Sequence, residues 1–198
     1  ELQNPVFEPA SSEEETYDNY FEMTNYTTAL SYRLTDDLTV YTRGGLDKRD
    51  FSARYFYTRS TFDKSEEQIS SRWGLGAITF ERGSHRSEFN VSYRNVDDTF
   101  DFIPGVITPN EHTTDQLFLN LSHQVEFSGE SISNRFNYIR VMVGGQYLDK
   151  QIESTDRGNH QTDMGGIYSI GHFSWVNGLS ITASTRVQFD SIASTEFL

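Results

Sequence analysis

Side chains that could act as nucleophiles, bases or metal ligands are spread thinly along this chain. Its five histidines form neither a helical HExxH pair nor a tight cluster. Ser122 and His123 are adjacent, and adjacent residues of a strand point to opposite faces, so they could not work as nucleophile and base. A hydrolase would need a serine and a histidine converging from different strands, which no spacing here indicates. We therefore expect no enzymatic activity and assign no catalytic residues.

Metal and cofactor chemistry finds little support either. The chain has no cysteine, which removes thiolate ligands and thiolate nucleophiles together. Two acidic segments, Asp63–Glu67 and Asp97–Asp101, could attract Ca²⁺, but their spacing matches no EF-hand loop. We expect solvated loops there, with no metal site and no cofactor.

A recurring combination of arginines and carboxylates is more informative. In several strand-like stretches these charges share the polar phase, so they would gather on one side of a sheet. Inside a narrow barrel they must pair, because an isolated buried charge costs several kcal/mol. In a wide barrel they would line a water-filled pore and set its ion selectivity. The number of strands decides between these two interiors. About eight strands leave an interior that side chains just fill, whereas porins have about sixteen. The residues predicted to face the interior are Arg33, Glu88, Arg94, Glu126, Arg140, Arg186 and Asp190.

Alternation of apolar and polar residues with a period of two predicts the strands that carry these charges. It is clearest in 117–127 and 179–190, where apolar residues recur at alternate positions. A barrel in a membrane would turn this apolar phase outward. The residues predicted to face lipid are Leu117, Leu119, Leu121, Leu179, Ile181, Ala183 and Val187.

Residues 38–59 decide the strand count. Gly44-Gly45 and the charges after them could form a hairpin turn, which would give about nine strands. They could equally form a bulge in one long strand, with the apolar phase slipping between Val40 and Phe51. We favour the single strand and about eight strands, several of them longer than the ~9–11 residues that a tilted spanning strand needs. The predicted strands are 18–34, 38–59, 69–82, 86–97, 114–127, 132–148, 161–176 and 179–191.

The connections between these strands alternate in length. In an up-and-down meander every second connection lies at the same end of the sheet, so short turns would share one end and long loops the other. This asymmetry is typical of a barrel in a bacterial outer membrane, with periplasmic turns and extracellular loops. Tyr32 and Phe127 near the turns, and Tyr57 and Tyr147 toward the loops, fit two interfacial aromatic belts. The short connections are 35–37, 83–84, 128–131 and 176–178, and the long ones are 60–68, 98–113 and 148–160.

Composition agrees with this architecture. A net charge of −13 argues against nucleic acid as a partner. Solvation of the surface accounts for this charge most simply, and a cationic partner or divalent cations bridging to lipopolysaccharide would also suit it. The hydrophobic fraction of 35% is low for a water-soluble core, whereas 14% aromatic residues argue against disorder. No run approaches the ~18–20 apolar residues of a spanning helix. We expect a cleaved signal peptide or a mid-chain start before Glu1, an acidic extended segment over 1–17 and a barrel domain over 18–198.

Two segments, 29–41 and 88–94, resemble hairpin units of bacterial outer-membrane porin-like barrels, in which a strand ending in Ser-Tyr-Arg leads into a turn and an amphipathic return strand. One departure is the chain end, where Phe189 closes the last good alternation and Phe197 is penultimate, instead of a strand with a terminal aromatic residue.

We therefore expect an all-β, antiparallel up-and-down transmembrane β-barrel of about eight strands, or part of a larger barrel, in the bacterial outer membrane. It would act as a scaffold with functional extracellular loops or as part of a porin-like channel, in contact with outer-membrane lipid, lipopolysaccharide and other envelope proteins or subunits. The alternative is a soluble secreted barrel or sandwich that binds a ligand or assembles into a surface layer. Such a barrel would turn its apolar residues inward.

Overall fold

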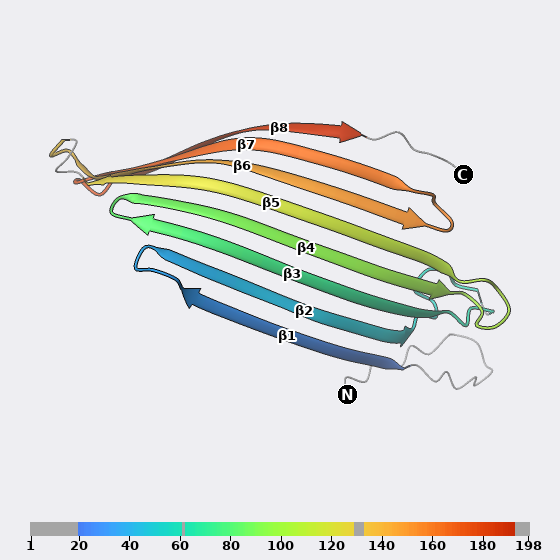
Figure 1. Cartoon of the computed structure of the whole chain (residues 1–198). Coiled ribbons are helices and arrows are strands. Elements are labelled where there is room, and N and C mark those ends of the chain that lie inside the picture. Colours follow the sequence, from blue (N-terminus) through green and yellow to red (C-terminus); the bar gives the residue numbers. More distant parts are fainter. Residues whose placement is uncertain (1–19, 61, 129–132, 193–198) are drawn as a thin grey trace.

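The computed structural model describes residues 20–60, 62–128 and 133–192, and their regular secondary structure is entirely β (Figure 1). The predicted segment 1–17, and the chain end after Ile192, lie outside the described residues. No helix in the described ranges is long and apolar enough to cross a membrane. The strands are β1 (Phe21–Arg33), β2 (Leu38–Ser52), β3 (Glu66–Arg82), β4 (His85–Asp101), β5 (Asn110–Ser128), β6 (Phe136–Ser154), β7 (His160–Trp175) and β8 (Ser180–Ile192).

All eight strands belong to one antiparallel sheet in the order of the chain. This confirms the all-β, up-and-down prediction and the count of eight. Residues 38–52 form a single strand whose register with both neighbours is unbroken, so neither a hairpin nor a bulge interrupts β2. The only register shift among the described pairs lies between Phe136 and Tyr138 of β6.

Two of the three long connections are shorter than predicted, 102–109 and 155–159, because the strands on both sides continue into them. The β2–β3 connection is longer than predicted, 53–65, because β2 ends at Ser52 and the predicted strand end at residue 59 was wrong. The 155–159 connection is no longer than 129–135 at the opposite end, so the predicted asymmetry holds only in part. Residues that were expected in loops, such as Asp98 and His112, pair with each other across β4 and β5. Strand pairing satisfies backbone groups that a loop would leave to water, and this favours the extension.

Register divides the sheet into two chemically distinct faces. Tyr32, Val40, Ile78, Phe89 and Leu121 are successive cross-strand neighbours and define what we call the apolar face. The opposite face, which carries the arginines and carboxylates of the strands, is called the polar face.

The apolar face forms a band of limited height. On β5 it runs from Leu117 to Phe127 and on the last hairpin from Leu179 to Phe189. At about 3.4 Å per residue and a strand tilt near 40°, such a stretch rises about 26 Å, close to the ~25 Å apolar band of outer-membrane barrels.

Beyond this band, toward the 53–65 loop, the two faces exchange character. The former apolar face continues with polar residues such as Lys48 and Asp50 on β2. The polar face becomes apolar there, where Phe51 packs against Phe21 with ring centroids 5.8 Å apart and against Phe56 at 6.1 Å. This exchange explains the phase slip between Val40 and Phe51 without a bulge.

The described part of the chain contains almost no protein-covered hydrophobic core. Ala53 is its one buried apolar residue, whereas Tyr26, Leu30 and Ile167 on the apolar face are 68%, 63% and 60% exposed. An apolar surface of this extent indicates contact with a membrane or with another protein.

The sheet has two unpaired margins. No Cα of β1 comes within 8 Å of a Cα of β8, and every described residue of β1 is exposed. Figure 1 shows the two strands at opposite sides of the sheet. Each margin therefore presents backbone N–H and C=O groups without a partner strand in the described structure.

The face assignment makes a direct prediction for charge insertion. We expect Leu121→Arg to destabilise the lipid-embedded protein by roughly 2–4 kcal/mol, because it puts a cation in the apolar band. Ser122→Arg, one residue away on the polar face, should cost clearly less. Urea unfolding in lipid vesicles measures both, and equal losses would contradict the assignment.

Candidate functional site

Register places all seven predicted interior residues on the polar face. They come from five strands: Arg33 lies on β1, Arg186 and Asp190 on β8, and the others on β4, β5 and β6. The residues predicted to face lipid share the apolar face, with Leu179 directly before β8. That these faces meet water and lipid remains a prediction.

Only one of the expected arginine–carboxylate pairs forms among the seven. Arg140 and Glu126 are cross-strand partners, and Arg140 donates from Nε and Nη2 to the same Glu126 oxygen at 2.9 and 2.7 Å. Glu88 instead accepts from Arg86 at 3.1 Å and from Asn90 at 2.9 Å.

The remaining charges are spread along the face. Arg186 donates to Gln188 at 2.9 Å, and Gln188 donates to Asp190 at 2.8 Å. Arg94 donates from Nε to the Ser71 hydroxyl at 3.3 Å rather than to a carboxylate. Arg33 is not joined to the other six in the described structure. The face is thus a polar surface with local pairs and not the continuous network expected of a packed narrow interior.

The 53–65 loop is held by an internal carboxylate. Asp63 is 1% exposed and accepts hydrogen bonds from the backbone N–H groups of Tyr55, at 2.8 Å, and Ser65, at 2.9 Å. The left-handed backbone of Tyr55, with φ of 63°, turns its N–H into this arrangement. Asp63 therefore organises the loop backbone, whereas the sequence had indicated a solvated loop.

This loop folds over the polar face. The Tyr57 hydroxyl donates to Glu67 at 2.9 Å, and its ring meets Phe100 edge-on with centroids 5.1 Å apart. Burial, and then the Glu67 carboxylate, raise the pKa of Tyr57 to about 12, so its hydroxyl stays a donor at neutral pH. Tyr57 had been assigned to the loop-side aromatic belt. Its hydroxyl and ring instead contact Glu67 and Phe100, which are cross-strand partners on the polar face.

Tyr93 and Tyr147 do lie on the apolar face, at its loop-side boundary. Their hydroxyls donate to the carboxylates of Asp115 and Asp163 on the neighbouring strands. A ring on the apolar side and a hydroxyl on the charged side is the arrangement expected of interfacial tyrosine.

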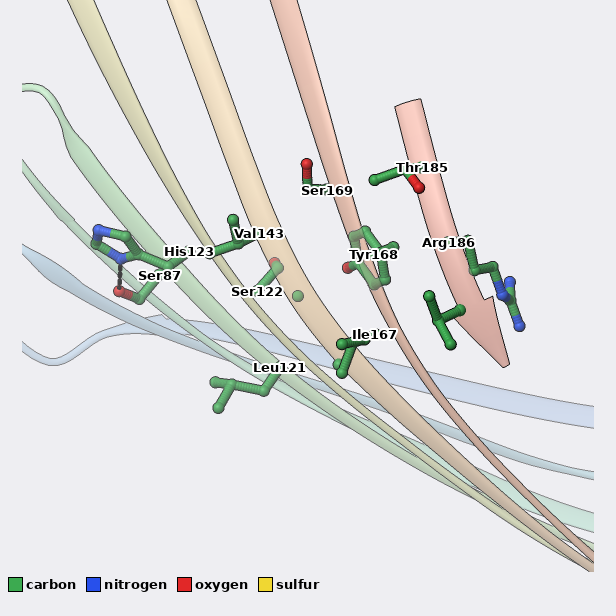
Figure 2. Close-up of a pocket in the computed structure, with 13 residues that line it drawn as sticks. Ser87, Leu121, Ser122, His123, Val143, Ile167, Tyr168, Ser169, Thr185 and Arg186 are labelled. Carbon is green, nitrogen blue, oxygen red and sulfur yellow. Dashed lines mark hydrogen bonds between the residues drawn. The ribbon is translucent and has the colours of Figure 1, made fainter. Parts of the chain in front are cut away.

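The apolar face also contains a hollow of about 660 Å³ over β4 to β8, drawn in Figure 2. At one side the Ser87 hydroxyl lies 2.8 Å from His123 Nδ1, and His123 Nε2 lies 3.5 Å from His85. This serine–histidine contact was missed because it depends on the register of β4 with β5 across a loop. Within the described residues no carboxylate contacts His123 to orient it as a catalytic base, so the pair gives no specific support to an enzyme.

Comparisons with known proteins found no matching family model, no matching curated protein and no matching solved structure.

The loop anchor can be tested by hydrogen exchange. Asp63→Ala removes two hydrogen bonds to a charged acceptor, each worth about 1.5–3 kcal/mol. We expect amide exchange of 53–65 to become at least about tenfold faster, as measured by mass spectrometry. The neighbouring exposed Lys64→Ala is the control and should leave the rate unchanged. Exchange as slow as in the unsubstituted protein would rule out the anchoring role of Asp63.

Proposed function

We propose that this chain forms the wall of a porin-like β-barrel in the bacterial outer membrane, with the polar face toward a water-filled lumen. The observation that carries the proposal is the pairing of an apolar band of membrane height with a charged opposite face. Above that band the outward residues are polar and the inward residues apolar, as they would be where a barrel wall leaves lipid and meets water.

Burial favours this orientation over the soluble barrel. The strand residues with buried side chains include Asp47, Glu67, Ser71 and Ser174, and all lie on the polar face. Side chains crowd on the concave side of a curved sheet, so these buried residues support placing the polar face on the inner side of the wall. A ligand-binding barrel in water would have the apolar side chains crowded inside and the polar ones outside.

The open margins support the wide-barrel form of the proposal. In hydrocarbon every backbone polar group needs a partner, so in a membrane β1 and β8 would need partner strands that the described structure does not supply. Arg94 and Arg140 remain exposed on the polar face instead of packing against a facing wall. A wider barrel would leave both side chains in water.

Outward charge suggests how the wall contacts lipopolysaccharide. Asp97, Asp115, Asp149 and Asp163 lie on the former apolar face just beyond Tyr93 and Tyr147. Divalent cations could bridge these carboxylates to lipid phosphates, whereas direct contact of like charges is unfavourable.

Ion selectivity tests the lumen assignment. The chain is reconstituted in planar bilayers, and reversal potentials are measured in a salt gradient. Arg94→Glu should shift selectivity toward cations, because it adds negative charge to the lumen wall. The matched control is Arg72→Glu, which makes the same charge change on the opposite face. A shift of equal size for both variants, or the absence of channel steps, would contradict a lumen lined by the polar face.

Surface labelling tests the topology. A tag inserted after Gly105, in the β4–β5 connection, should be labelled on intact cells. A tag in the Gly83-Ser84 turn should be labelled only after the outer membrane is permeabilised. The reverse pattern would contradict the orientation, and labelling of both sites would contradict membrane insertion.

A further inference from the structure

A second cavity, of about 390 Å³, lies on the polar face over β1 to β5 near the loop-side end of the apolar band. We call it the Trp73 cavity. It is lined by Asn25, Asp47, Arg49, Ser71, Trp73, Gly74, Leu75, Ser92, Tyr93, Arg94 and Gln116.

The indole of Trp73 is held in place by its neighbours. Gly45 is its cross-strand partner on β2, and a Cβ there would come within 2.9 Å of the indole ring. The ring therefore lies close over the Gly45 backbone, where only glycine leaves room. The Arg43 guanidinium lies 5.5 Å from the ring centroid, at cation–π distance. The result is an aromatic surface fixed in the wall of the polar face.

The charges around this ring do not cancel. Arg49 Nε lies 2.9 Å from Asp47 Oδ1, and Asn25 donates to the other Asp47 oxygen at 3.4 Å. Asp47 is 8% exposed, so its charge is largely matched by Arg49 within the cavity. Arg43 and Arg94 have no carboxylate partner in the described structure. The cavity is therefore locally basic, although the chain as a whole has a net charge of −13.

Trp73 and Arg94 are direct cross-strand partners, and Gln116 is the next residue along the same row. Adjacent strands lie about 4.8 Å apart, so an indole, a guanidinium and a carboxamide are spaced at about the width of a six-membered ring. Arg94 donates a hydrogen bond from Nε to Ser71, and its terminal nitrogens remain available for an anion.

We infer that the Trp73 cavity binds a carboxylate that is attached to a ring, such as a uronic acid or an aromatic acid. The ring lies on Trp73 and the carboxylate meets Arg94. Gln116 and Asn25 supply hydrogen bonds to further polar substituents. The inference rests on the proposed function, because it requires the polar face to be open to water and solutes. In the proposed barrel the cavity would be a selective solute-binding site at the mouth of the lumen.

Tryptophan fluorescence provides the test, since the chain has two tryptophans, Trp73 and Trp175. In a Trp175→Phe background, refolded in detergent micelles, the protein is titrated with galacturonate, benzoate, galactose and acetate. We expect a saturable change with galacturonate or benzoate and at least about tenfold weaker binding of galactose and acetate. The stronger of the two acids identifies the ring. Equal binding of galactose would show that charge is irrelevant, equal binding of acetate that the ring is irrelevant, and either overturns the inference.

Matched variants locate the site. Arg94→Gln should weaken binding of the preferred acid at least about tenfold, which corresponds to about 1.4 kcal/mol. Arg72→Gln, on the opposite face, should leave binding unchanged. Heat-modifiable gel mobility confirms that both variants fold. Unchanged affinity in Arg94→Gln overturns the assignment.

Conductance measured on the same preparations separates the cavity from the channel. A conducting protein without saturable binding overturns the cavity alone. Saturable, Arg94-dependent binding by a protein that produces no channel steps overturns the channel alone.

Discussion

The parity of the antiparallel ladder is the constraint on which the structure depends. Side chains alternate between faces with a period of two, so a slip by one residue in any pair would move a whole strand's apolar residues to the other face. The register continues without a shift from β1 through β5 and across the band on the later strands. The one register shift among the described pairs, between Phe136 and Tyr138, lies at the turn end of β6, before the band residues Ile139 and Val141, whose pairing with β7 is regular.

Parity was also what the sequence could predict. The alternation in 117–127 and 179–190 is clear enough to assign both faces, and the structure separates the residues in that way. The strand count came from a second pattern, the alternation of short and long connections, which a single strand over 38–59 preserves and a hairpin there would break. The structure has one strand in this region, over Leu38–Ser52. Contacts between strands far apart in the sequence could not be predicted, because the register across a loop depends on how many loop residues join the strands. Ser87 with His123 and Tyr57 with Phe100 are of this kind. The first contact depends on the register between β4 and β5, and the second depends on the course of the 53–65 loop. Neither can be read from the sequence of one segment.

The apolar face and both sheet margins are exposed in the described structure, which leaves apolar side chains uncovered and backbone groups unpaired. In water, residues such as Leu30 and Ile167 would lose the stabilisation of burial, and the unpaired backbone of β1 would invite pairing with other chains. In hydrocarbon the apolar band is stabilised, but the cost of unpaired backbone groups rises to several kcal/mol each. Closure into a complete barrel would resolve both, because it would cover the margins and leave only the band in contact with lipid.

The charged side chains are distributed differently on the two faces of the sheet. Acidic side chains such as Asp115 and Asp163 lie on the former apolar face beyond the band, where they accept hydrogen bonds from the boundary tyrosines. The polar face carries its arginines at the height of the band, partly paired, as with Arg140 and Glu126, and partly unpaired, as with Arg94. A wall that is acidic outside and locally basic inside would repel anions at the cell surface and stabilise them within the lumen. In the proposed barrel the 53–65 loop would lie at the loop-side mouth of the lumen, so a solute on its way to the basic region would pass Tyr57 and Glu67 first. Selection of solutes in such a wall would thus come from the order of these environments along the path as well as from the width of the pore.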